Sequence, residues 1–165
     1  MNKLKLIALA GIFSFALVSC EKEVDLVSNN DLQNYDFALT GSQVVPASSS
    51  TAGGTIKGTY DRSEKTYTYT LQWNGLSGNP TAIHFHGVAD RGYAAIPLAP
   101  LAAYPNGIVQ TFYGFKTSPS GTYNGTLYVD GSVIKEHDLL AGKFYVDIHT
   151  AAFPGGEIRG QIIFP

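Results

Sequence analysis

Three of the chain's four histidines fall in two short stretches that alternate apolar and polar residues. In residues 81–87 (TAIHFHG), the alternation places His84 and His86 on the same face of a strand, about 6.6–6.8 Å apart. His149 ends a second alternating run, residues 144–149. Imidazole is a ligand that suits Zn and Cu, and strands hold ligands rigidly. The pattern predicts a mononuclear Zn or Cu site with three histidine ligands and a water at the open position.

Three charged residues accompany these histidines near the end of the chain: Asp147, Glu157 and Arg159. The two carboxylates are expected to accept hydrogen bonds from imidazole N–H groups and so orient the rings. Arg159 is expected to act as an anion clamp or to pair with Asp147 across the strands. Without a metal, the histidines would hydrogen-bond to Asp147, Glu157, Tyr145 or backbone carbonyls and form a polar network that fixes strand register. The carboxylate pair Asp147 and Glu157 would also suit glycoside hydrolysis, which is the least favoured reading.

The fourth histidine argues against a two-metal centre. His137 is flanked by Glu136 and Asp138, and no further histidine is left to bridge two metals. A likeness of the His84 and His86 pair to the copper strand of Cu/Zn superoxide dismutases therefore extends only to the sandwich architecture.

The elements that must position these residues are short strands separated by Gly, Pro and Asn turns. Residues 66–73 alternate without interruption, and residues 143–165 read as a hairpin that turns at the sequence PGG, residues 154–156. Further strands are expected at residues 35–41, 55–60, 108–115 and 121–129, and one helical turn within 132–140. About eight strands predict an all-β fold, an antiparallel β-sandwich of immunoglobulin-like or superoxide dismutase-like Greek-key type. A closed barrel is the alternative.

One long stretch, residues 89–106, has no period and contains three prolines, which is typical of a loop. It is unusually apolar. Ile96, Leu98, Leu101 and Tyr104 are expected to close one end of the sandwich. The alternative is a partner-binding surface formed by four residues of this loop: Tyr93, Ile96, Leu98 and Tyr104.

Composition narrows the class of protein. Of the 165 residues, 44% are hydrophobic and only 15% are charged, which favours a packed β domain over a disordered chain. The formal net charge is −2 and Lys and Arg do not cluster, so the sequence lacks the basic surface of a nucleic-acid-binding protein.

The first residues have the layout of an exported protein's leader. Two lysines precede an apolar run, residues 6–18, that is too short for a transmembrane helix. The sequence LVSC at residues 17–20 resembles the lipobox of bacterial lipoproteins, which implies lipidation of Cys20. We expect residues 1–19 to be a signal peptide and residues 20–34 to be a lipidated cysteine with a flexible tether. A lipid anchor would make the membrane a partner and the location the cell envelope, as an outer-membrane lipoprotein.

Five sequence motifs resemble the CHRD family, which is named after chordin. They are FALTGSQVVP (37–46), LSG (76–78), TAIHFHG (81–87), LLAG (139–142) and YVDIHTAAFPGGEIRGQ (145–161). The resemblance implies a CHRD-like β-sandwich over residues 35–165 that acts as an extracytoplasmic binding or structural module, with an envelope protein or glycan as partner. Chordin's cysteine-rich modules are absent from this sequence, so growth-factor binding is not implied. A three-histidine metalloprotein with redox activity is the alternative function.

Overall fold

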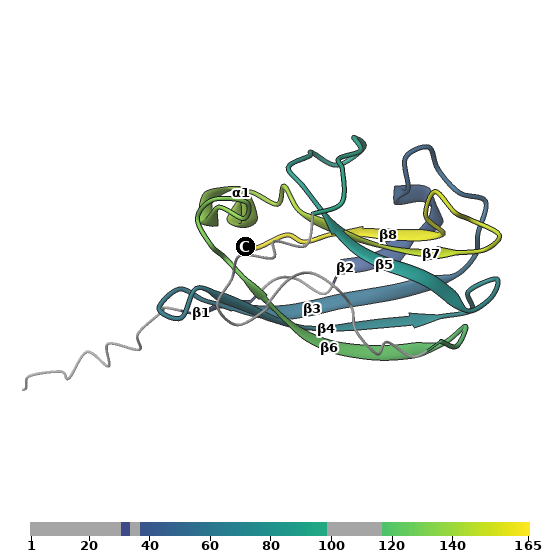
Figure 1. Cartoon of the computed structure of the whole chain (residues 1–165), viewed down its shortest axis with the longest axis horizontal. Coiled ribbons are helices and arrows are strands. Elements are labelled where there is room, and N and C mark those ends of the chain that lie inside the picture. The colour runs from purple at the N-terminus through teal and green to yellow at the C-terminus, as the bar shows by residue number, and fades with distance from the viewer. Residues whose placement is uncertain (1–30, 34–36, 99–116) are drawn as a thin grey trace, which may run out of the picture.

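The computed structural model describes residues 31–33, 37–98 and 117–165, and the regular secondary structure of this part of the chain is almost entirely β (Figure 1). The strands are β1 (Asp31–Gln33), β2 (Phe37–Thr40), β3 (Gly53–Asp61), β4 (Thr66–Asn74), β5 (Pro80–His86), β6 (Gly121–Tyr128), β7 (Tyr145–Thr150) and β8 (Ile158–Gln161). A 3-10 turn, η1 (Gly41–Gln43), and a short helix, α1 (Glu136–Leu140), complete the described elements.

The strands form one antiparallel sheet in the order β5-β7-β8-β2-β3-β4-β6, with β1 paired to β3. The sheet curls, so that β5, β7 and β8 lie over β3, β4 and β6 as a second layer (Figure 1). Strand β2 forms the corner, because it pairs with β3 on one side and with β8 on the other. The all-β antiparallel prediction is confirmed, and the curled sheet is consistent with a β-sandwich.

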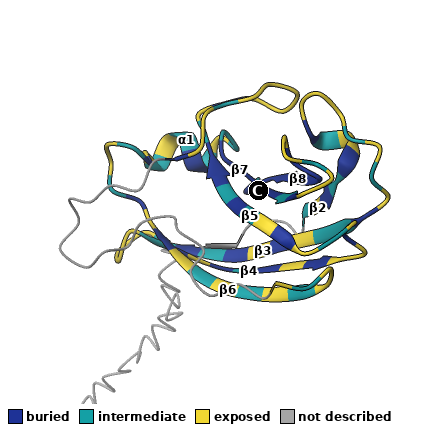
Figure 2. Cartoon of the chain, turned by 45° about the vertical axis from the view of Figure 1, so that its right-hand side comes forward, coloured by how far each residue is buried: buried dark blue, intermediate teal, exposed yellow. Residues whose placement is uncertain are grey.

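The core lies between the two layers and follows from the alternation in β4. Tyr67, Leu71 and Trp73 are buried, while the threonines between them face outward. Phe85 of the opposite layer packs edge-on against Tyr69, with ring centroids 5.0 Å apart. Burying each such side chain stabilises the fold by about 1.5–3 kcal/mol. Figure 2 shows the buried positions along the inner faces of both layers.

The expected strands have counterparts in the described residues, with one exception that lies outside them, residues 108–115. The expected helical turn is α1. Strand β1 falls within residues 20–34, where the sequence predicts a tether, so three residues of that stretch pair with the sheet. In the described part of the chain, no helix has the length and apolar character needed to cross a membrane.

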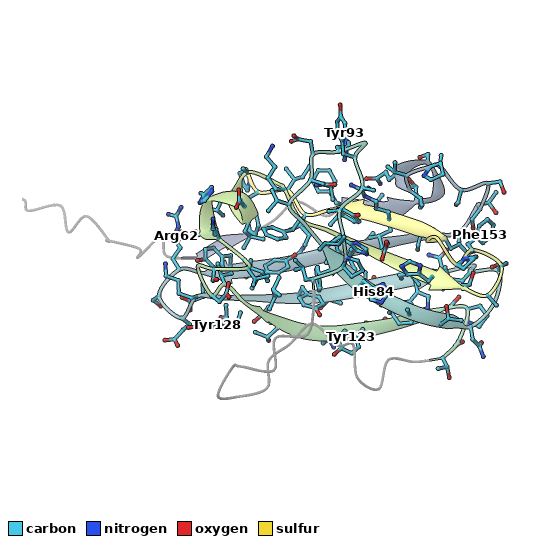
Figure 3. The ribbon with its side chains drawn as sticks, turned by 45° about the horizontal axis from the view of Figure 1, so that its top comes forward. Arg62, His84, Tyr93, Tyr123, Tyr128 and Phe153 are labelled. Atoms are coloured by element: carbon cyan, nitrogen blue, oxygen red, sulfur yellow. The ribbon has the colours of Figure 1, made fainter. Side chains whose placement is uncertain are left out.

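The long loop corrects one expectation. Leu98 is buried, with 9% of its surface exposed, as expected for a residue that closes the sandwich. Ile96 is 80% exposed and Tyr93 is 70% exposed, so the expectation that Ile96 packs into the core is wrong. Figure 3 shows Tyr93 pointing away from the molecule. Leu101 and Tyr104 lie outside the described residues.

Candidate metal centre

The outer face of the β5-β7-β8 layer gathers the histidines. In the antiparallel pairing of β5 with β7, His84 lies opposite Asp147, and His149 lies opposite Ala82, the next position of β5 on that face. Because side chains alternate along a strand, His86 points to the same face two residues further on. The register therefore brings three imidazoles around one carboxylate.

The distances within this cluster are short. Asp147 Oδ1 lies 2.9 Å from His149 Nε2, 3.1 Å from His86 Nε2 and 3.9 Å from His84 Nδ1. His84 Nδ1 and His149 Nε2 are 3.1 Å apart. One potential ligand atom from each of the four residues lies within 4.8 Å of all the others. Neighbouring ligands of a tetrahedral Zn are about 3.3 Å apart when the Zn–N bonds are about 2.0 Å, so most of these spacings already match a metal site.

Two of the rings are oriented by backbone carbonyls. His86 Nδ1 lies 2.9 Å from Ala95 O, and His149 Nδ1 lies 2.8 Å from Pro154 O. A carbonyl oxygen only accepts, so these contacts are hydrogen bonds when the proton is on Nδ1. The Nε2 lone pairs then face the cluster. Metal-binding histidines typically donate their second N–H in this way, which fixes the tautomer and the ring.

This arrangement gives each of the two oriented rings more acceptors than it has protons. A neutral imidazole has one N–H group, but His86 and His149 each lie between a backbone carbonyl and the carboxylate of Asp147. In a neutral ring the nitrogen without a proton is itself an acceptor. Its contact, with the backbone carbonyl or with the carboxylate, therefore brings two acceptors together. A divalent cation on the Nε2 lone pairs and Asp147 Oδ1 removes the conflict. Protonating both rings also removes it, but places two positive charges side by side.

The electrostatics differ among the members of the cluster. Burial raises the pKa of Asp147, but hydrogen bonds from His149 and His86 outweigh it and hold that pKa below its ordinary value. For His149, burial lowers the pKa and the bond to Asp147 outweighs it, so the pKa is raised. Burial and the neighbouring His149 lower the pKa of His84. The cluster therefore offers an ionised carboxylate and at least one neutral ring at neutral pH.

Access to the cluster is from the side of His84. Its side chain is 37% exposed, whereas those of His149, His86 and Asp147 are 13% exposed or less. Figure 3 shows His84 on the ribbon of β5. An incoming ion or ligand therefore meets His84 first, and the other three groups lie behind it.

A segment that we call the strap, residues 87–98, covers the rest of this polar face. Its backbone accepts hydrogen bonds from buried side chains of the sheet: Arg159 donates to Tyr93 O and Gln161 donates to Ala89 O, both at 2.9 Å. Arg159 also donates to Gln161 rather than to Asp147, at 3.0 Å, and its guanidinium lies 3.4 Å from the ring centroid of Tyr145. Arg159 is thus a buried cation that holds the strap.

Glu157 lies apart from the imidazoles and is fully buried beneath a network of hydroxyl groups, of which that of Ser77 belongs to an exposed residue. Its Oε1 accepts from Ser50 Oγ and from the backbone N of Ser77, both at 2.8 Å. Its Oε2 accepts from Ser77 Oγ at 2.7 Å and from Thr150 Oγ1 at 2.6 Å. A carboxylate with no exposed surface and four donors holds loops together. It does not orient an imidazole, and it does not present an acid to a glycan.

The remaining histidine is elsewhere. His137 lies on the exposed side of α1 beside Asp138, 3.1 Å away. The sequence predicts Tyr145 and backbone carbonyls only as hydrogen-bond partners of the histidines in a metal-free network. In the structure the ring of Tyr145 stacks on His86 with centroids 4.7 Å apart, and the carbonyls are those of Ala95 and Pro154. The only signal for Tyr145 is its place in the same alternation as Asp147 and His149. Backbone carbonyls give no sequence signal.

Fold and site together define a small all-β module with a cluster of imidazoles on an outer sheet face. The chain matches the model of the CHRD domain over residues 35–162, and it belongs to that family. CHRD domains occur in extracellular and secreted proteins, which makes export of this chain plausible. No curated protein and no solved structure matches the chain.

Proposed function

We propose that the chain is an extracytoplasmic CHRD module that binds one transition-metal ion through His84, His86, His149 and Asp147. The observation that supports this most directly is the four ligand atoms within 4.8 Å of one another, with two of the rings held by carbonyl oxygens. Three imidazole nitrogens and one carboxylate oxygen suit Zn²⁺ and Cu²⁺. At equal availability, Cu²⁺ is expected to bind more tightly than Zn²⁺.

The chemistry of the site depends on which ion it holds. Zn²⁺ has no redox chemistry and would act as a Lewis acid or a structural tie between β5 and β7. Copper cycles between two oxidation states, and the partly exposed edge at His84 would admit a small reactant. The redox reading therefore requires copper to be the resident ion.

Metal titration tests this function. Protein spanning residues 21–165 is expected to bind one Zn²⁺ or Cu²⁺ per chain, measured by calorimetry and by elemental analysis after dialysis. Replacing His149 with alanine should lower the binding affinity at least tenfold, because the ring supplies a ligand and each 1.4 kcal/mol lost is a tenfold change. His137→Ala is the matched control and should bind like the wild type, since His137 lies on α1 outside the cluster. Equal binding by all three proteins would refute the assigned site.

A second role, capture of an envelope protein or glycan, is supported by a different observation. Tyr93 and Ile96 lie on the same short segment, the strap, and are 70% and 80% exposed, and exposed apolar side chains that gather in one place mark interaction surfaces. The two roles are compatible, because the exposed side chains and the imidazole cluster use different surfaces of the strap and sheet.

We also propose that the module is tethered to a membrane of the bacterial cell envelope, as an outer-membrane lipoprotein. The support is the apolar leader followed by LVSC at residues 17–20. Replacing Cys20 with alanine is expected to move the protein from the membrane fraction to the soluble fraction when the chain is expressed in a bacterium. Incorporation of labelled palmitate into the wild type alone would report the acylation itself. Membrane association that persists in the variant, without label in the wild type, would contradict lipidation.

A further inference from the structure

The strap is bound to the sheet mainly by hydrogen bonds, with few apolar contacts. Three of its apolar side chains, Val88, Tyr93 and Ile96, are 52%, 70% and 80% exposed. Only residues near its two ends, Ala89 and Leu98, have buried apolar side chains. Its middle is therefore held by other contacts: its carbonyls accept bonds from buried donors of β5, β7 and β8, Asp90 pairs with Lys143, and Arg91 lies over the ring of Phe37.

Ala95 is where these bonds concentrate. Its carbonyl accepts from His86 Nδ1 at 2.9 Å and from the hydroxyl of Tyr145 at 3.2 Å, and its N–H lies 3.0 Å from the same hydroxyl. One of the donors is thus a ligand of the proposed metal, and the other stacks on that ligand with an interplanar angle of 6°. The hydrogen bonding of the Ala95 peptide therefore depends on the position and the tautomer of His86.

The tautomer links this peptide to the metal. Neutral His86 has one N–H to share between Ala95 O and Asp147 Oδ1, which lie at opposite edges of its ring. A metal on Nε2 forces the proton onto Nδ1, where it can only point to Ala95. Without a metal, the tautomer that donates to Asp147 leaves two acceptors facing each other at Ala95. That state weakens the attachment of the strap.

We propose that metal binding locks the strap against the sheet, and that the strap in turn sets the affinity of the site. This inference rests on the proposed metal site and concerns its regulation. Coupling between two sites is reciprocal: if the metal stabilises the docked strap by some factor, docking tightens metal binding by the same factor. The metal would thereby control the surface that displays Tyr93 and Ile96.

Tyr145 is the positioning residue in this coupling. It lies on β7, between His86 on β5 and Arg159 on β8, and contacts both: its ring is parallel to the imidazole and lies 3.4 Å from the guanidinium carbon. Its hydroxyl bonds both polar groups of the Ala95 peptide. A shift of the strap therefore moves the ring that supports His86.

The strap contains its own reporter, the exposed Arg91, after which trypsin cleaves. Arg62, in the β3–β4 turn, provides a reference site remote from the cluster, with 43% of its side chain exposed. Limited digestion with and without stoichiometric Zn²⁺ is expected to lower the ratio of Arg91 cleavage to Arg62 cleavage by about 5- to 150-fold. An unchanged ratio, in protein that calorimetry shows to be loaded, would overturn the inference and leave the metal site standing. Absence of Zn²⁺ and Cu²⁺ binding in the calorimetry would overturn the site and the inference together.

A conservative variant tests the reciprocal direction. Tyr145→Phe keeps the ring that stacks on His86 and removes the hydroxyl that holds Ala95. Zn²⁺ affinity is expected to fall about tenfold or more, as for other groups that orient a ligand, and cleavage after Arg91 should be faster with and without metal. Tyr93→Phe, on the exposed side of the strap, is the control and should change neither quantity. Wild-type affinity and wild-type cleavage in Tyr145→Phe would refute the role of the strap.

Discussion

Replacing Asp147 with asparagine is expected to lower the affinity for Zn²⁺ or Cu²⁺ by about three orders of magnitude. Asp147 provides the only carboxylate in the cluster, and its Oδ1 faces the nitrogens of all three rings. Two unit charges 4 Å apart attract by about 4 kcal/mol at an effective dielectric constant of 20. Each 1.4 kcal/mol is a tenfold change in affinity. Asparagine keeps the shape of the side chain and removes this charge.

Competition titration against a chelator of known affinity measures this loss. Asp138→Asn is the matched control, because Asp138 also lies beside a histidine but on α1. It should bind metal like the wild type. A tight site in Asp147→Asn would mean that the three imidazoles suffice, and that the carboxylate only orients His86 and His149.

Glu157→Ala is expected to cost about 1.5–3 kcal/mol of the free energy of unfolding, the range typical of hydrogen bonds to a charged group. The change removes the carboxylate that accepts from three hydroxyls and a backbone N–H, those of Ser50, Ser77 and Thr150. Of these residues only Thr150 is fully buried, and its hydroxyl keeps a contact with the Ser77 hydroxyl at 3.0 Å. Each buried donor left unpaired costs about 1–3 kcal/mol, and these costs are not additive. Denaturant titration measures the loss.

The pH dependence of the same network has a definite sign. Burial raises the pKa of Glu157, but hydrogen bonds from Thr150, Ser77 and Ser50 outweigh it and keep the pKa below its ordinary value. The stabilisation is therefore present above the pKa of an unfolded glutamate, about 4.3, and is lost as the pH falls through the folded pKa. Glu157→Ala should not show this loss. Glu64→Ala, an exposed glutamate in the β3–β4 turn, should change stability by less than about 0.5 kcal/mol; equal effects of the two variants would contradict the network's importance.

The strands were predictable because their signal is local. Residues 66–73 alternate without a break, and the structure has β4 there with Tyr67 and Trp73 inside. For the same reason the sequence predicted which residues of β5 and of β7 share a face, and therefore that His84 and His86 lie on the same face of β5. The pairing register of β5 with β7 was not predictable, because alternation within one strand says nothing about which residue of another strand lies opposite. Only the structure places His84 opposite Asp147.

The strap shows what sequence pattern leaves out. Apolar residues in a loop predict burial, and Leu98 follows that rule, whereas Ile96 is exposed. The reason is that the sheet face beneath the strap is polar. Its donors hydrogen-bond to the backbone carbonyls of the strap, so the strap's side chains point to solvent. Glu157 also differs from expectation. Its residue type suggested a partner for imidazole, but its carboxylate accepts hydrogen bonds from serine hydroxyls of two neighbouring loops and from the threonine hydroxyl at the end of β7.

The position of β8 in the sheet has a consequence for how the protein matures. This strand ends at Gln161 and lies between β7 and β2, so among the described strands it joins, through β2, the half of the sheet that holds the imidazoles to the half that holds the β3–β4 hairpin. Such distant pairings close late, because loop-closure entropy opposes them. During synthesis the sheet cannot be completed until residue 161 has emerged. The pair β5–β7, which carries all four proposed ligands, would then dock onto the rest of the sheet only after β8 has been made.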